Sequence, residues 1–82
     1  MLIINHPLYD YNIKYDYSNL PKDLQELIHL LEEYDKTRDW FNYDLKYDEL
    51  EVDAKSYLIS GRISEYDFKM ITRKYGGILW LR

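Results

Sequence analysis

Carboxylates are the chemically most versatile side chains of this sequence, and they are concentrated in its middle. Residues 21–54 hold eleven acidic and four basic side chains, a net charge of −7. Residues 1–20 have two acidic and one basic (−1), and residues 55–82 have two acidic and six basic (+4). If 40–60 is a helix, Asp44, Asp48 and Glu51 share one face. Such a face is either an ordinary solvated surface or one that binds a basic groove on another protein.

Tyrosines lie among these carboxylates and add contact area, because the tyrosine ring is large, rigid and amphipathic. Duplex DNA carries about one charge per 1.7 Å of axis. Three carboxylates over seven helical residues span about 10.5 Å, so any mimicry of DNA is partial. The sequence suggests a non-enzymatic inhibitor that occupies the basic groove of a nucleic-acid-handling protein. Its predicted contact residues are Asp39, Tyr43, Asp44, Tyr47, Asp48 and Glu51.

The basic C-terminal third supports a second hypothesis, direct DNA binding. A helix, a glycine-containing corner and a further helix outline a helix-turn-helix, with Arg62, Lys69, Arg73 and Lys74 available for phosphates. However, the first turn of that last helix carries two acidic residues where base contacts are expected. Basic side chains near a helix C-terminus are also explained by the helix dipole. We therefore favour a protein partner over nucleic acid.

Metal and catalytic chemistry have little support in the sequence. His29 and Glu33 are four residues apart on one predicted helix, but two ligands do not make a metal site, and the chain has no cysteine and no HExxH motif. Asp53-Ala54-Lys55 resembles the PD-(D/E)xK nuclease signature only in those three letters, and on a helix its two charged side chains diverge. We expect no enzymatic activity, no bound metal and no cofactor.

Three helices are predicted to position these side chains. Apolar and tyrosine residues recur at three-and-four spacing over 21–37, 40–60 and 64–75. Gly61 suits the left-handed residue after a helix, and Ser64 begins a capping box. A chain of 82 residues is one domain, 1–82, because a second domain would have too little core.

The two ends of the chain are predicted to be strands. Residues 9–17 alternate strictly between tyrosine or isoleucine and polar side chains, which is typical of a half-buried β-strand within region 1–20. A second apolar run predicts a strand over 78–81. The predicted fold class is therefore α+β, a three-helix core with a short antiparallel sheet from the N- and C-terminal segments.

Two stretches resemble known proteins. Residues 58–68 are similar to the helix–Gly–x–Ile–Ser/Thr–helix corner of SHOCT-type domains, through Gly61, Ile63 and Ser64. More broadly, residues 20–77 resemble short uncharacterised proteins of Gram-positive phages and mobile elements. The motifs that carry this second resemblance are Asp39-Trp40-Phe41-Asn42-Tyr43-Asp44 and Arg73-Lys74-Tyr75-Gly76. Together with the acidic segment, it implies an anti-CRISPR-like or DNA-mimic inhibitor.

Location and assembly are constrained less by the sequence. No apolar run reaches the ~18 residues of a membrane span, and the N-terminus lacks the basic and apolar regions of a signal peptide. We therefore expect a cytoplasmic protein with no membrane contact. A third hypothesis stays open, a structural oligomerisation module in which the tyrosine strand or the helical corner forms a homodimer.

Overall fold

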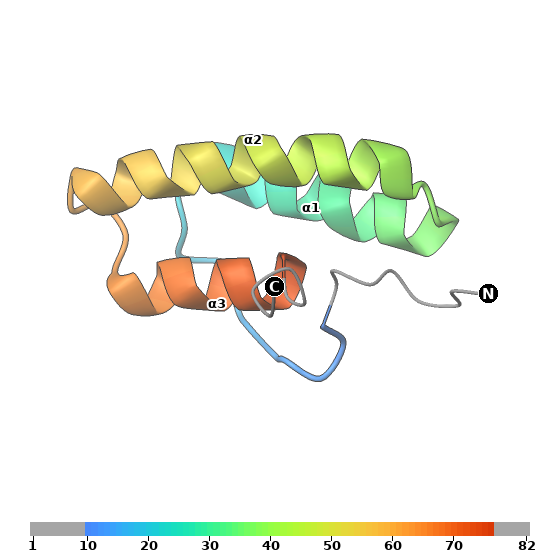
Figure 1. Cartoon of the computed structure of the whole chain (residues 1–82). Helices are drawn as coiled ribbons and strands as arrows, with labels where there is room; N and C mark the ends of the chain where they lie inside the picture. The colour runs from blue at the N-terminus through green and yellow to red at the C-terminus, as the bar shows by residue number, and fades with distance from the viewer. Residues whose placement is uncertain (1–9, 77–82) are drawn as a thin grey trace.

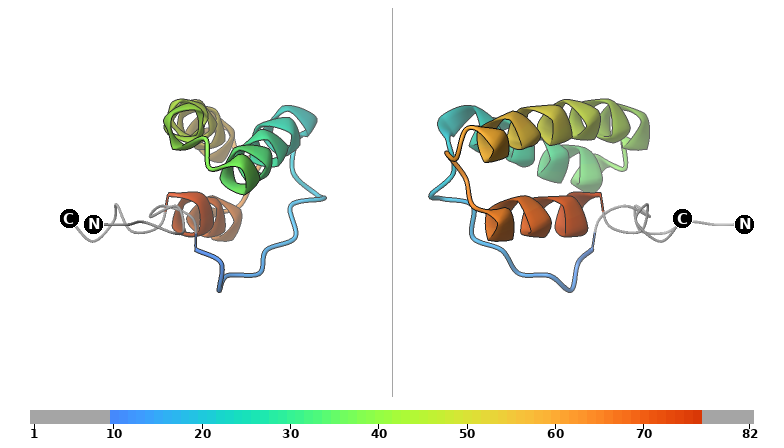
Figure 2. Two further views of the ribbon diagram at one scale, coloured as in Figure 1. Left: turned by 90° about the vertical axis from the view of Figure 1, so that its right-hand side faces the viewer. Right: turned by 60° about the vertical axis from the view of Figure 1, so that its left-hand side comes forward.

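The computed structural model describes residues 10–76 and contains three helices there: α1 (Lys22–Thr37), α2 (Trp40–Ile59) and α3 (Glu65–Tyr75). Helices α1 and α2 lie side by side and antiparallel, and α3 packs beneath them, antiparallel to α2 (Figure 1). Seen along their axes, the three helices form a triangle (Figure 2). These spans agree with the predicted helices at 21–37, 40–60 and 64–75 to within one residue.

One hydrophobic core fills the space between the helices. Each helix turns a stripe of apolar side chains inward, and full burial of one such side chain stabilises the fold by about 1.5–3 kcal/mol. None of the helices formed by residues 10–76 is long and apolar enough to cross a bilayer. The buried core residues are Leu20, Leu24, Leu27, Ile28, Leu31, Tyr43, Tyr47, Leu50, Ala54, Ile63, Ile71 and Tyr75.

Local signals determine where the helices begin and end. Ser64 caps α3 as predicted, because its Oγ accepts a first-turn backbone N–H at 3.0 Å. Gly61 has a φ of +79°, the left-handed conformation predicted for it. The turn between α1 and α2 places Arg38 at a φ of 59°, and Asp39 then caps α2. The chain therefore reverses within two residues and holds α1 and α2 as a tight hairpin.

The predicted α+β class is wrong, because residues 10–76 contain no strand and form a three-helix bundle. Residues 10–20, which we name the strap, run without helix or strand. The predicted alternation is present over residues 13–17, where Ile13, Tyr15 and Tyr17 are half-buried and Lys14 and Asp16 are exposed. It fails before them, because Tyr11 is 48% exposed and Asp10 is half-buried. Alternation of apolar and polar residues indicates which side chains face the protein. A β-strand also requires backbone hydrogen bonds to a neighbouring strand. The remainder of the predicted N-terminal strand region and the strand at 78–81 lie outside the described residues.

Hydrogen bonds tie the strap to both ends of α3. The backbone N–H of Asp10 donates to the carbonyl of Lys74 at 2.7 Å, and Lys74 Nζ donates to the carbonyl of Ile13 at 2.5 Å. At the other end of the helix, the Tyr15 hydroxyl donates to Asp67 Oδ1 at 2.7 Å. The strap therefore runs antiparallel to α3 before it reaches the start of α1 (Figure 2).

Candidate functional site

The outer side of α2 carries four large apolar side chains at the protein surface. Phe41, Leu45, Val52 and Ile59 are 74%, 53%, 67% and 79% exposed. Steps of four and three residues alternate along α2 through positions 41, 45, 48, 52, 55 and 59, and this spacing places all six on one side of a helix. We name this row the outer stripe; its members are Phe41, Leu45, Asp48, Val52, Lys55 and Ile59.

The core does not account for the outer stripe. At about 100° per residue, Leu50 points opposite to Phe41 and Ile59, and Leu50 is fully buried. The side of α2 that faces away from α1 and α3 is the outer side (Figures 1 and 2). An amphipathic surface helix normally has a single apolar stripe, whereas α2 is apolar on two opposite sides. Exposed apolar patches of this kind mark interaction surfaces in monomeric proteins.

Predicted carboxylates lie within the outer stripe, at Asp48, and along one flank of it; we name Asp44, Asp48 and Glu51 the acidic border. Asp44 and Asp48 are exposed and Glu51 is half-exposed, at steps of four and three residues that keep them on the same side. Asp39 is set apart, because its carboxylate accepts hydrogen bonds from Asn42 N at 3.3 Å and Asn42 Nδ2 at 2.7 Å. The structure therefore brings three of the four predicted carboxylates together and uses the fourth as a helix cap.

Tyr43 and Tyr47 lie in the core, so neither ring supplies the contact area expected from the sequence. They are 0% and 4% exposed. The Tyr43 hydroxyl donates to the carbonyl of Tyr75 at 2.8 Å. Tyr47 packs on Gly76 so closely that a Cβ added there would lie 2.2 Å from the Tyr47 hydroxyl oxygen. Burial, together with two neighbouring carboxylates, raises the pKa of Tyr47.

The outer stripe was missed from the sequence, although a signal for it is present. The three-and-four spacing of the inward residues predicts only the core face of α2, and the remaining apolar residues follow a second stripe of their own. Counting from Phe41 in alternating steps of four and three residues reaches Leu45, Val52 and Ile59. A helix whose apolar residues satisfy two opposite stripes predicts one core face and one binding face.

Of the four basic residues considered for DNA binding, the fold leaves three exposed and buries one. Arg62, Lys69 and Arg73 are exposed, and the Arg62 guanidinium lies 5.2 Å from the centre of a tyrosine ring. Lys74 is only 8% exposed, and its ammonium donates to the carbonyl of Ile13 in the strap. One of the four predicted phosphate contacts is thus committed to holding the strap on α3.

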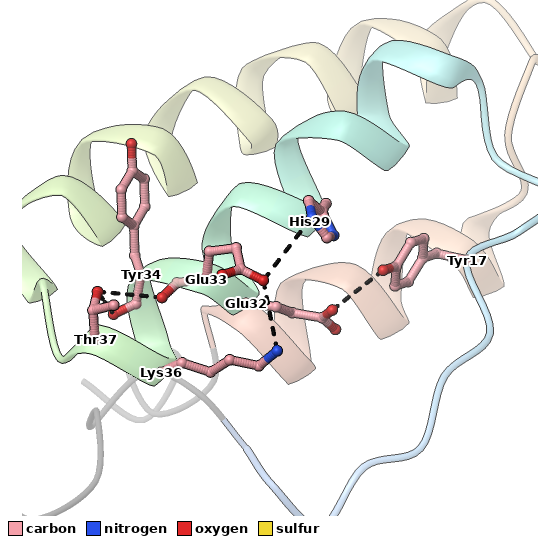
Figure 3. A network of polar contacts seen from close by, with 7 residues as sticks. All are labelled: Tyr17, His29, Glu32, Glu33, Tyr34, Lys36 and Thr37. Carbon is pink, nitrogen blue, oxygen red and sulfur yellow. Dashed lines mark hydrogen bonds and ion pairs between the residues drawn. The ribbon is translucent and has the colours of Figure 1, made fainter.

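Tyrosine hydroxyls donate to several of the carboxylates that gave the middle of the sequence its charge. Glu32 accepts from Tyr17 at 3.2 Å and from Tyr75 at 3.1 Å, one bond to each oxygen. Figure 3 shows Tyr17 reaching from the strap to Glu32 on α1. Burial and the nearby Glu32 carboxylate raise the pKa of Tyr17. Tyr11–Asp35 and Tyr57–Asp23 are further pairs of this kind, and Tyr15 donates in the same way to Asp67 on α3.

The acidic side chains on the outside of α1 do not form a chemical site. His29 Nε2 and Lys36 Nζ lie 4.0 Å and 3.5 Å from Glu33 Oε2 (Figure 3), and all three side chains are exposed, so these pairs contribute little. Residues 10–76 contain no group of His, Cys, Asp or Glu that could hold a metal ion. An open groove of about 580 Å³ adjoins His29; it is lined by Tyr17, Lys22, Gln25, Glu26, His29 and Leu30.

Comparison of the chain with protein-family models, with curated proteins and with solved structures finds no match in any of the three. Function is therefore inferred from the outer stripe and its acidic border alone.

Proposed function

We propose that this chain is a non-enzymatic protein-binding module whose contact surface is the outer stripe with its acidic border. The observation that carries the proposal is the exposure of Phe41, Leu45, Val52 and Ile59 on the side of α2 opposite to the core. Covering side chains of this size is worth on the order of 1.5–3 kcal/mol each when complete. More than half of each of these four side chains is left uncovered by the bundle, so a partner that covers them gains this apolar contact.

The acidic border defines the chemistry of the partner. Asp44, Asp48 and Glu51 favour a surface that combines apolar side chains with lysine or arginine, because charge complementarity directs association and excludes like-charged surfaces. The basic groove of a nucleic-acid-handling protein meets this description. In that case the apolar residues of the outer stripe supply the contact area, and the protein acts as an inhibitor by covering the groove.

Site-specific photocross-linking tests the proposed surface. A photoreactive amino acid replaces Val52 at the centre of the outer stripe, and in a matched variant it replaces the exposed Lys69 on α3. We expect illumination of cells that produce the chain to give a discrete cross-linked protein species from position 52 and not from position 69. Equal cross-linking from both positions, or none from position 52, contradicts the proposal.

Charge reversal tests the acidic border separately. The triple variant Asp44→Lys, Asp48→Lys and Glu51→Lys keeps the apolar residues and reverses the border. If the partner is a basic protein, the cross-link from position 52 is lost in this variant. If it persists undiminished, the apolar residues alone carry the binding and the inhibitor hypothesis loses its electrostatic basis.

A further inference from the structure

We infer that the outer stripe binds a basic amphipathic α-helix of the partner, which packs lengthwise along α2. This partner class rests on the proposed function, since it names the element of the partner that covers the same surface. In a nucleic-acid-handling protein, such a helix forms a wall of the basic groove. Many DNA-binding proteins enter the groove of DNA with a helix of this kind, so a protein that covers the helix keeps nucleic acid away.

The spacing of the outer stripe suits a helix as its partner. Alternating steps of four and three residues repeat every 3.5 residues on average, which keeps one side of a helix against another over several turns. From Phe41 to Ile59 the outer stripe spans about 27 Å, or about five turns. A strand of the partner finds no sheet edge to extend here, because residues 10–76 contain no strand. A helix of about 18 residues contacts the outer stripe along its whole length.

Carboxylates lie on both flanks of the outer stripe. At about 100° per residue, Asp44 and Glu51 lie about 60–80° to one side of its midline, and Glu49 lies about 80° to the other side. These positions face the flanking residues of a helix packed on the stripe. Lysine or arginine on both flanks of the partner helix therefore meets a carboxylate whether that helix runs parallel or antiparallel to α2.

Two of the carboxylates have no counter-charge in the bundle. In the part of the chain that the structure describes, no ion pair includes Asp48 or Glu51. Glu49 does have a partner, because Lys46 Nζ lies 3.2 Å from its Oε1. That pair is exposed, so exchanging it for a partner lysine changes the free energy little. A basic helix thus supplies the counter-charges that Asp48 and Glu51 lack.

Other occupants fit the charge of this surface less well. A second copy of the chain would bring its own acidic border against the same carboxylates. Anionic membranes and nucleic acids would also be repelled. Lys55 is the one basic residue of the outer stripe, and its long side chain extends past the contact to solvent.

Synthetic peptides provide the probe. The basic peptide has about three heptads, with leucine at the two apolar positions and lysine on both flanks. Its lysines keep it from pairing with itself. The acidic peptide has glutamate in place of every flanking lysine. In fluorescence anisotropy with the whole chain, we expect the basic peptide to bind with a dissociation constant of about 1–100 µM and the acidic peptide to bind at least about thirtyfold more weakly.

Two measurements test whether the bound peptide is a helix. The far-ultraviolet ellipticity of the mixture is expected to exceed the sum of its components, because a short peptide gains helix when it packs on a protein. A variant peptide with proline at a central outward position keeps the lysines and leucines but breaks the helix. It is expected to bind at least about tenfold more weakly. Equal binding without a gain in ellipticity refutes a helical partner.

A change in the middle of the outer stripe tests the apolar contact. Val52→Ser is expected to weaken the basic peptide at least about tenfold. Tyr66→Ser removes a comparably exposed side chain from α3 and leaves binding unchanged; Val52 and Tyr66 are 67% and 64% exposed. Circular dichroism checks that each variant keeps its helices.

Charge reversal tests the flank. Asp44→Lys/Glu51→Lys is expected to reduce the preference for the basic over the acidic peptide at least about tenfold. Glu26→Lys/Glu33→Lys makes the same charge change at the same spacing on the outside of α1, where both side chains are exposed. This control leaves the preference within about threefold of the parent. An equal effect of the two variants would show that the peptide senses only net charge, and it would refute the assignment to α2.

Failure of this partner class and failure of the proposed function give different results. If the basic peptide binds no better than the acidic one, a basic helix is refuted, while a cross-link from position 52 to a cellular protein still supports the proposed surface. Sedimentation of the chain alone at about 100 µM is expected to give the 10.1 kDa monomer. A dimer that Val52→Ser abolishes would overturn the inference by assigning the outer stripe to a second copy. Flotation on anionic phospholipid vesicles that Val52→Ser abolishes would likewise assign it to a membrane.

Discussion

Replacement of Gly76 by alanine tests how α3 closes on α2. A Cβ at position 76 would lie 2.2 Å from the hydroxyl oxygen of Tyr47, 2.3 Å from Cζ and 2.9 Å from Cε2, whereas ordinary contacts begin near 3.4 Å. The ring would have to move by 3.4 − 2.2 = 1.2 Å. It is 4% exposed and enclosed by the core, so it has little room to do so. Gly76→Ala should therefore be destabilising for steric reasons.

The backbone conformation of Gly76 allows a steric effect to be separated from a backbone effect. Its φ of −111° and ψ of −5° suit any residue, so alanine introduces no strain there. Alanine also restricts the backbone of the unfolded chain more than glycine does. This effect alone would raise the free energy of unfolding by about 0.4–1 kcal/mol. Overpacking a core costs about 1–3 kcal/mol. The net loss of unfolding free energy is therefore about 1–2 kcal/mol, which for a chain of this length lowers the melting temperature by about 5–15 °C.

A double-mutant cycle isolates the contact. Tyr47→Leu removes the three ring atoms that an added Cβ would meet, although it lowers stability by itself. In the Tyr47→Leu background, Gly76→Ala should be neutral or stabilise by about 0.4–1 kcal/mol. The steric clash is absent there, and only the lower entropy of the unfolded chain with alanine remains. Urea unfolding followed by circular dichroism, applied to the parent, both single variants and the double variant, gives the coupling energy.

Gly61→Ala serves as the control in both backgrounds. Nothing lies within 4 Å of a Cβ at position 61, but its φ of +79° strains any side chain, so the cost should not depend on Tyr47. An equal cost of Gly76→Ala with and without the Tyr47 ring would refute the packing described for α3. It would also reopen Tyr47 as a residue that contacts a partner.

Three further predictions concern local features of the bundle. Arg38→Gly should stabilise by about 0.5–1 kcal/mol in urea unfolding, since relief of the left-handed strain (about 1–2 kcal/mol) exceeds the added flexibility of glycine (about 0.5–1 kcal/mol); no gain would contradict the strained turn. Ser64→Ala should destabilise by about 1 kcal/mol in thermal melts and Ser64→Asp should not, since aspartate can cap α3. Burial and the bond to Asp67 raise the pKa of Tyr15 above its usual value near 10. The unfolded state then releases the hydroxyl proton first, so this stabilisation is complete below pH ~10 and is lost as the pH rises through the raised pKa. Tyr15→Phe should lose less stability than the parent between about pH 9 and about pH 11, and an equal loss would argue against this linkage.

The helices could be predicted from the sequence because their signals are local. Three-and-four spacing marks the inward faces, and Gly61 and Ser64 set the corner before α3 through their own backbone and hydroxyl. The reversal at Arg38 could not be predicted in the same way. A left-handed arginine is strained by itself, and it is held there because the hairpin of α1 and α2 requires the turn.

The strap shows where a correct pattern led to a wrong element. Alternation of Ile13, Tyr15 and Tyr17 with polar residues fixes which side chains face inward, and the structure agrees. Whether such a segment pairs as a strand depends on a neighbouring backbone, which a single stretch of sequence does not specify. Here the tyrosine hydroxyls supply the attachment instead, by donating to carboxylates on α1 and α3. That role also explains part of the acidic excess on α1.

The residues predicted to form a contact surface are brought together only in part by the fold. Asp44, Asp48 and Glu51 do share a flank of α2, as helical spacing requires. The aromatic residues assigned to the same surface face the core, since Tyr43 and Tyr47 fall on the opposite side of the helix. The exposed apolar side chains of α2 belong instead to the outer stripe.

The hydrogen bond between Asp10 and Lys74 also determines how the molecule would respond to a pulling force. These residues lie near the two ends of the described chain, and their backbones are joined at 2.7 Å. A force applied at residues 10 and 76 would load this bond and the Tyr15–Asp67 bond before it reaches the hairpin of α1 and α2. Single-molecule extension should then show two events, release of the strap with α3 followed by opening of the hairpin. The bonds that join the strap to α3 are therefore expected to break first under load.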